Sequence, residues 1–269
     1  MPPQVSSKQQ PPTNDPVEII RRAAANDEEN DKRALDYTYI EHDVQKELDR
    51  KGKLKSTHTK TQEVFTLDGD EIDRLIEKDD KPLPEKDAKK EDERINKWME
   101  KRKAESPDEK KKRLAQAEKE RQEDRAFIQE VAKAYDFTML PSETVGGREA
   151  FVIDAVPRAG YVPHGKNANI LPKLKFRVWI DSSEYQAIKL EATVIDTFTW
   201  GVFVLRLHPG TRFELEQTRV NDEVWLPQHV AVKIDVRFAL LKSYNADIDV
   251  TFRDYKKFRS EIKITPVQQ

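Results

Sequence analysis

The chain of 269 residues contains no cysteine, which excludes disulfide bonds, thiolate metal sites and a cysteine nucleophile and leaves the redox compartment open. No apolar run is long enough to cross a bilayer. The formal net charge is −2, so no global basic field attracts nucleic acid. These absences argue against a disulfide scaffold, a helical membrane protein and a nucleic-acid binder.

Catalytic motifs are also missing. We find no P-loop, dinucleotide fingerprint or nucleophile elbow, and the segment 145–148 (Val-Gly-Gly-Arg) reads as a hairpin turn. The histidines are scattered without metal-ligand spacing. His42 and His58 could face each other across a predicted hairpin, but a plain solvated pair is a commoner arrangement than a metal site. We therefore expect no enzyme, no cofactor and no metal.

The charged residues concentrate in one segment, 84–134. Acidic and basic side chains alternate there at spacings that suit solvent-exposed helices with i,i+4 pairs. A cap, a proline and a capping glutamate at Ser106, Pro107 and Glu109 predict a second helix start, so the segment reads as a helical hairpin inserted into the fold. Only its end, with Phe127, Ile128, Val131 and Tyr135, is expected to dock firmly.

Before this segment the sequence predicts a helix and a hairpin. Asp15 can cap a helix with Pro16 at its first position and Glu18 completing a capping box, and the helix should fade at 26–30. Segments 35–48 and 55–67 suggest two strands joined by a turn at 49–52, and 71–78 suggests a third strand. Residues 1–14, rich in proline and glutamine, are expected to be disordered, and 15–269 to form a single domain.

From Phe137 onward the chain reads as successive strands with short connections and no crossover helices. This pattern predicts an antiparallel sheet that curls or packs on a helix, and hence an α+β fold. The run 200–207 is apolar on both faces and could be a strand or a short buried helix.

A period-two apolar stripe on two of these strands gives the candidate site. A large curved sheet with one apolar face and few helices to cover it makes a natural apolar cavity. The alternative is that the same side chains fill a closed core. The predicted ligand-binding residues are Ile188, Leu190, Ala192, Val194, Val230, Val232, Ile234, Val236 and Phe238.

Three short motifs carry a family resemblance. The segment 178–181 (Val-Trp-Ile-Asp) followed by 187–190 (Ala-Ile-Lys-Leu), the upstream 151–157, and 216–227 ending in Trp-Leu-Pro resemble the bacterial periplasmic outer-membrane lipoprotein-sorting family. That family comprises the LolA/LolB-like carriers and their RseB-like relatives. The resemblance covers 137–258 well and the first helix and hairpin loosely. The charged segment 84–125 departs from the carrier pattern, and no arginine can be matched to the carrier's functional arginine.

The resemblance implies a fold and a function. The fold is a curved antiparallel half-barrel with helices closing its mouth, and the function is non-enzymatic binding of lipid or lipoprotein acyl chains, with an envelope protein as a second kind of partner. It also implies a periplasmic location, with a secretory signal that this sequence lacks; a cytoplasmic location is the alternative. The alternative function is a structural or protein-interaction module that uses the charged helical hairpin as its contact surface.

Overall fold

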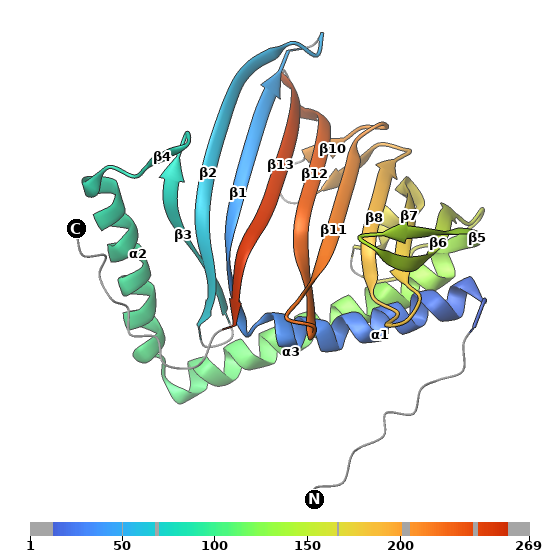
Figure 1. The fold of residues 1–269 in the computed structure, drawn as a ribbon, viewed down its shortest axis with the longest axis horizontal. Coiled ribbons are helices and arrows are strands. Elements are labelled where there is room, and N and C mark those ends of the chain that lie inside the picture. Colours follow the sequence, from blue (N-terminus) through green and yellow to red (C-terminus); the bar gives the residue numbers. More distant parts are fainter. Residues whose placement is uncertain are drawn as a thin grey trace, which may run out of the picture.

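The computed structural model describes residues 13–49, 51–67, 70–165, 167–200, 205–238 and 242–257. In this part of the chain the strands form one antiparallel sheet in the order β4-β3-β2-β1-β13-β12-β11-β8-β7-β6-β5 (Figure 1). In addition, β10 pairs with β12, and β9 pairs with β10. The sheet is curved and is not closed into a barrel, since β4 and β5 lie at its two ends. The predicted α+β fold with a curved antiparallel sheet is confirmed.

The helices and strands have the following bounds. The helices are α1 (Pro16–Ala34), α2 (Glu85–Lys103), α3 (Pro107–Ala134) and the short 3-10 helix η1 (Ala168–Lys173). The strands are β1 (Tyr37–Leu48), β2 (Leu54–Leu67), β3 (Asp70–Lys78), β4 (Lys81–Pro82), β5 (Tyr135–Val145), β6 (Arg148–Pro157), β7 (Leu174–Asp181), β8 (Ala187–Val194), β9 (Phe198–Trp200), β10 (Leu205–Leu207), β11 (Arg212–Val220), β12 (Val224–Phe238) and β13 (Lys242–Lys257).

The first helix begins as predicted but ends later. The Asp15 side chain accepts a hydrogen bond from the Val17 amide, and Pro16 occupies the first turn. Glu18 does not complete a capping box; its carboxylate pairs with the guanidinium of Arg22 at 3.0 Å. The helix continues to Ala34, and its asparagines bond away from the helix, Asn26 to the turn after β7 and Asn30 to Trp225 of β12, so the predicted end at 26–30 is wrong.

The first hairpin joins the last strand of the chain. Strands β1 and β2 form the predicted hairpin, and β3 follows as predicted. The other side of β1 pairs with β13, from Tyr37 opposite Lys257 to Leu48 opposite Asn245. Contacts between the two ends of the chain therefore join β1–β3 to the rest of the sheet.

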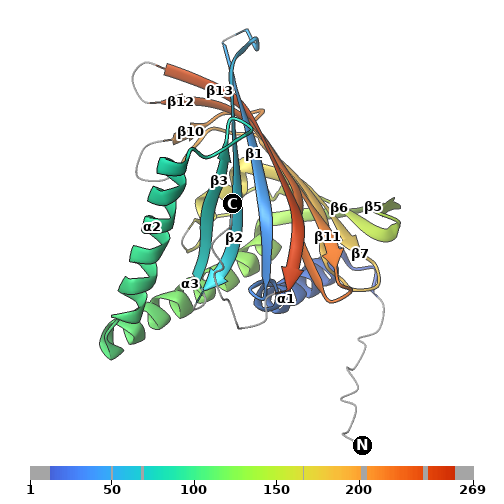
Figure 2. The same cartoon turned by 60° about the vertical axis from the view of Figure 1, so that its left-hand side comes forward.

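The charged segment forms two helices that do not pack as a hairpin. The split is as predicted: Ser106 and Glu109 form a reciprocal capping box at the start of α3. However, α2 stands beside β3 while α3 runs across the ends of the strands near α1 (Figures 1 and 2). The interpretation that only the end of the segment docks is also incomplete, because α2 contacts β3 and buries Ile95.

Two core clusters lie on one side of the sheet, beneath α1 and the end of α3. Ile19 and Ala23 of α1 are buried against Ile153, Val178 and Ile180 of β6 and β7. Next to this cluster, the end of α3 and η1 pack on Tyr135 and Phe176, and this second cluster includes Phe127 and Val131, the docking residues that the sequence predicted. Ile128, by contrast, is exposed.

The ambiguous run 200–207 belongs in part to strands. Its first residue, Trp200, ends β9, and β10 occupies 205–207; the two strands pair with each other and β10 pairs with β12. Residues 201–204 lie outside the described residues. Where the run is described, the strand alternative is confirmed.

Candidate functional site: the inner face of the sheet

The candidate site is the face of the sheet on which α1 packs, which we call the inner face. Residues paired directly across strands point to the same face. Starting beneath α1 at Val178, the pairings lead in one row from strand to strand. This first row comprises Leu190, Leu215, Val230 and Val250 on β8, β11, β12 and β13.

A second row runs parallel to the first, one residue pair further along the strands. It comprises Ala192, Phe213, Val232 and Ile248. The side chains of both rows are half-buried, whereas Ile153 and Val178 beneath α1 are buried. The inner face is therefore apolar from β8 to β13 but incompletely covered there.

The helices explain this difference in burial. Helix α1 covers the β6–β7 side and meets β12 near its start, while the end of α3 packs on η1, Tyr135 and Phe176. Half-buried apolar residues on four adjacent strands form a contiguous surface, and such surfaces mark sites of ligand or protein binding in soluble proteins.

The predicted site residues divide into three groups. Leu190, Ala192, Val230 and Val232 lie in the two rows. Val194 and Ile234 also lie on the inner side, where Val194 is buried with Phe198 and Leu207 and Ile234 packs against them. Val236 and Phe238 continue β12 opposite 244 and 242, and their side chains lie outside the described residues.

The placement of Ile188 on the same face as Leu190 is wrong. Ile188 is buried with Trp179 and Trp225, in a cluster separate from that of Leu190. The pairing of β7 with β8 shifts between Trp179 and Ile180, which face 189 and 187. This irregularity turns Ile188 to the outer face, and a simple period-two count along the strand cannot detect it.

Four residues of the two rows were missed by the sequence interpretation: Leu215 and Phe213 on β11, and Val250 and Ile248 on β13. Both segments were recognised as strands, and both alternate apolar with polar residues. The signal was therefore present, but only the pairing order places these residues beside β8 and β12.

A cavity of about 300 Å³ lies between α3, η1 and the start of β7. Its apolar walls are Phe127, Ile170 and Leu174. Ile170 and Leu174 also pack in the cluster that contains Ile234, so the cavity adjoins the inner face. Its rim carries the acidic residues Glu120, Glu123 and Asp124.

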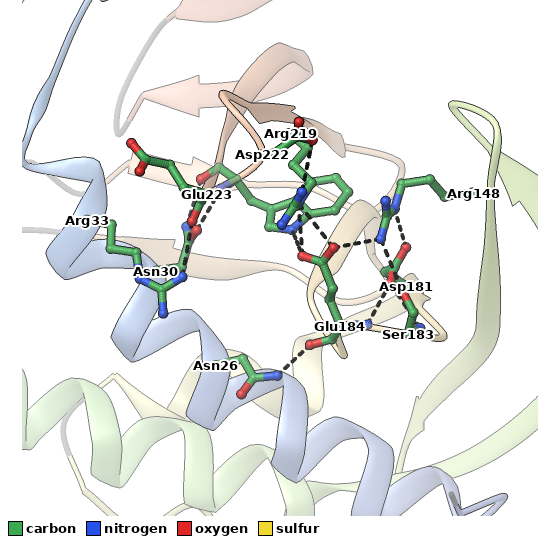
Figure 3. Close-up of polar contacts among 11 residues, drawn as sticks. Asn26, Asn30, Arg33, Arg148, Asp181, Ser183, Glu184, Arg219, Asp222 and Glu223 are labelled. Atoms are coloured by element: carbon green, nitrogen blue, oxygen red, sulfur yellow. Dashed lines mark hydrogen bonds and ion pairs between the residues drawn. The ribbon is translucent and has the colours of Figure 1, made fainter. Parts of the chain in front are cut away.

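A polar network fastens α1 to the ends of the strands (Figure 3). The Asn30 side chain both donates to the Trp225 carbonyl and accepts from the Trp225 amide, each at 2.7 Å. The Trp225 indole donates to Glu184 Oε2 at 2.9 Å, and Asn26 donates to the Glu184 carbonyl at 2.6 Å. These bonds fix the position of α1 over the inner face.

Asp181 anchors the same network. Its carboxylate is buried, accepts from Arg148 Nε at 2.5 Å and accepts from the Ser183 and Glu184 amides of the β7–β8 turn. Burial alone raises the pKa of Asp181, but the hydrogen bonds it accepts, led by Arg148, outweigh burial and hold the pKa below its usual value. Asp181 and Trp225 belong to the motifs that carry the family resemblance, and both have structural roles here.

The two histidines do not face each other. His42 lies opposite Thr61 and bonds to its hydroxyl at 3.0 Å, whereas His58 lies opposite Gln45 and therefore on the other face of the hairpin. Among the described residues no group of three histidine, aspartate or glutamate side chains is placed to hold a metal ion. No described helix combines the length and apolar character needed to span a membrane.

No family model matches the chain, and no curated protein matches it. Among solved structures, an outer membrane lipoprotein-sorting protein domain from Vibrio parahaemolyticus is 11% identical with a TM-score of 0.36, covering 91% of this chain and 95% of that domain. A DUF1329 family protein from Desulfovibrio piger is 11% identical with a TM-score of 0.35, covering 92% of this chain and 95% of its own. The MucA/MucB complex of Pseudomonas aeruginosa gives 11% identity and a TM-score of 0.22, covering 91% of this chain and 99% of the matched one.

The family that the sequence resembles is thus found among the structural neighbours, together with MucB. Likenesses of this distance assign neither a ligand nor a partner to the chain.

Proposed function

We propose that this protein is a non-enzymatic periplasmic binder of lipid or lipoprotein acyl chains, which it holds against the inner face. The observation that carries the proposal is the half-buried apolar surface of the two rows across β8, β11, β12 and β13. Adjacent strands lie about 4.8 Å apart, so each row offers an apolar track roughly 15 Å long. The motif resemblance to lipoprotein-sorting proteins supports a ligand of this kind and an envelope location.

The experiment that tests the proposal is titration with an apolar fluorescent probe. We expect saturable binding to the wild type and displacement by a fatty acid. In Val230→Glu, a carboxylate replaces the centre of the first row; because an unpaired charge on an apolar surface is costly, probe binding should fall at least tenfold. Val230 lies outside the fully buried clusters, so the variant should fold, which circular dichroism checks.

The matched control is Lys233→Glu on the same strand. Lys233 is exposed and points to the outer face, so the same carboxylate there should leave probe binding unchanged. Lipid extraction from the purified protein followed by mass spectrometry would identify a natural ligand. A folded wild type that takes up no probe would refute the acyl-chain proposal.

The second candidate is a protein-interaction module that uses the charged helices. The observation in its favour is that α3 exposes Leu114 and Ile128 amid charged residues. Many of those charges are already paired within the helix, for example Arg121 with Glu118 at 3.0 Å. Replacing Leu114 and Ile128 by serine should abolish partner capture without affecting probe binding if this surface is used.

A further inference from the structure

The inner face changes its chemical character at the boundary between β13 and β1. The first apolar row ends at Val250, whose partner on β1 is Asp43, and Asp43 in turn lies opposite Lys60 on β2. One pair along, Phe252 lies opposite Glu41. A ligand lying on the apolar rows therefore meets carboxylates one strand further on.

The side chains of β1 that share this face are predominantly acceptors. Because alternate residues share a face, Glu41, Asp43, Gln45 and Glu47 all point inward, as the partners of the inward-pointing residues of β13. Two more carboxylates, Glu71 and Asp73, lie beyond them on β3, where they accept hydrogen bonds from Tyr39 at 3.2 Å and Gln62 at 2.8 Å.

Asp43 is incompletely partnered. Its Oδ2 atom lies 3.4 Å from the Lys60 ammonium, while its Oδ1 atom is buried and has no hydrogen-bond partner among the described residues. Only 16% of the Asp43 side chain is exposed. A buried carboxylate oxygen without a donor is costly, and a ligand that supplies a donor removes that cost.

The electrostatic surroundings of the neighbouring Glu41 also favour a bound cation. Burial is the main cause that raises the pKa of Glu41, and the nearby charges of Asp43, Glu71 and Asp73 raise it further, while Lys60 lowers it. Three carboxylates and the Lys60 ammonium thus act on Glu41. A bound cation would stabilise these carboxylates, and a bound anion would be repelled.

We propose that the inner face is bipartite and takes a cationic amphiphile: the alkyl or acyl tail lies along the apolar rows, and an ammonium head lies at β1 beside Asp43 and Glu41. This inference rests on the proposed function, because it specifies the head group of the same ligand. An ammonium group offers three donors, enough to bond to two neighbouring carboxylates together.

The test compares amphiphiles that share one tail and differ in the head. Dodecylammonium, neutral dodecyl maltoside and dodecanoate are titrated into the full chain by calorimetry, below their micelle concentrations and at neutral pH. We expect dodecylammonium to bind about tenfold more tightly than the maltoside, as one charge-assisted hydrogen bond in a partly buried site provides, and dodecanoate more weakly than either.

Three variants test which residue causes the preference for the ammonium head group. Asp43→Asn should remove most of the preference for ammonium while dodecyl maltoside still binds, which shows that the variant is folded. Lys60→Gln should strengthen ammonium binding, since it removes the cation that competes for Asp43. Glu214→Gln, on the outer face of β11 opposite Glu191, is the matched control and should change nothing.

The outcomes separate the two proposals. Equal binding of the three amphiphiles, or a preference for dodecanoate, would overturn the bipartite face and leave acyl-chain binding intact. A preference for ammonium that survives in Asp43→Asn would overturn the assignment to β1. A folded wild type that binds none of the three would overturn both proposals.

Discussion

The two ends of this one sheet are built differently. From β5 to β7 the inner face is apolar and packed under α1, with Ile153 and Ile19 both at 0% exposure. From β1 to β3 the same face carries charged and amide side chains, and the edge is covered from the side by α2. The first end is held by burial of apolar surface. The second end buries Val64, Ile72 and Ile95 but also relies on backbone pairing and ion pairs, which contribute less per residue. The apolar rows lie between these two ends and are covered fully by neither α1 nor α2.

The largest expected effect is in the buried end. Ile153→Ala removes a side chain that is wholly buried beneath α1 and should lower the free energy of unfolding by about 3 kcal/mol. Ile40→Ala, the same change at a half-buried site on the outer face of β1, should cost about 1 kcal/mol. Urea unfolding measures both, and similar losses would show that the two ends are equally well packed.

The second-largest effect is expected for Asp181→Asn, whose loss of stability should depend on pH. The variant weakens the bond to Arg148 and the β7–β8 turn, and we expect a loss of about 2–3 kcal/mol at neutral pH. The pKa of Asp181 is lowered in the folded state, so its stabilisation is present above the unfolded value of about 3.9 and is lost as the pH falls through the folded pKa. The gap between wild type and variant should therefore shrink on acidification below pH ~4. A gap that is constant with pH would show that Asp181 acts through shape and not through charge.

Asn30→Ala tests how α1 is fastened. The change leaves the buried Trp225 amide without its acceptor, so unfolding should become easier by about 1–2 kcal/mol. The control Asn26→Ala removes two bonds, to the carbonyls of Glu184 and Tyr185, at an exposed position and should cost less than about 0.5 kcal/mol. Thermal unfolding of the two variants makes the comparison, and equal shifts in melting temperature would contradict it.

The smallest effect is expected at the α2 edge. The Leu75 amide on the outer edge of β3 donates to Glu91 Oε1 at 3.0 Å, and Arg94 donates to the Asp73 carbonyl. These side chains satisfy backbone groups that an unpaired edge strand would expose. Glu91→Gln, which weakens the acceptor, should speed hydrogen exchange at Leu75 severalfold with little change in global stability. Lys90→Ala, on the exposed side of α2, should leave exchange unchanged.

Local sequence signals predicted the elements well. The cap at Asp15, the capping box at Ser106 and Glu109, and the strand that carries the period-two pattern, β12, each depend on neighbours within a few residues, and each was found where expected. Errors arose where a distant partner decided the outcome. α1 continues past Asn30 because Trp225, far along the chain, supplies its hydrogen bonds. Ile188 turns outward because of an irregularity in the pairing of β7 with β8.

The sequence alone determined the fold class, the split of the charged segment and most of one apolar stripe, because hydrophobic periodicity and helix capping are properties of short segments. Only the tertiary structure decided which strands adjoin. The pairing of β1 with β13 places carboxylates next to apolar rows, although Asp43 and Val250 are far apart in the chain. Likewise, the positions of α1 and α2 decided which part of the inner face is covered and which stays open. Such contacts depend on packing between remote segments, and a pattern read along one strand does not contain them.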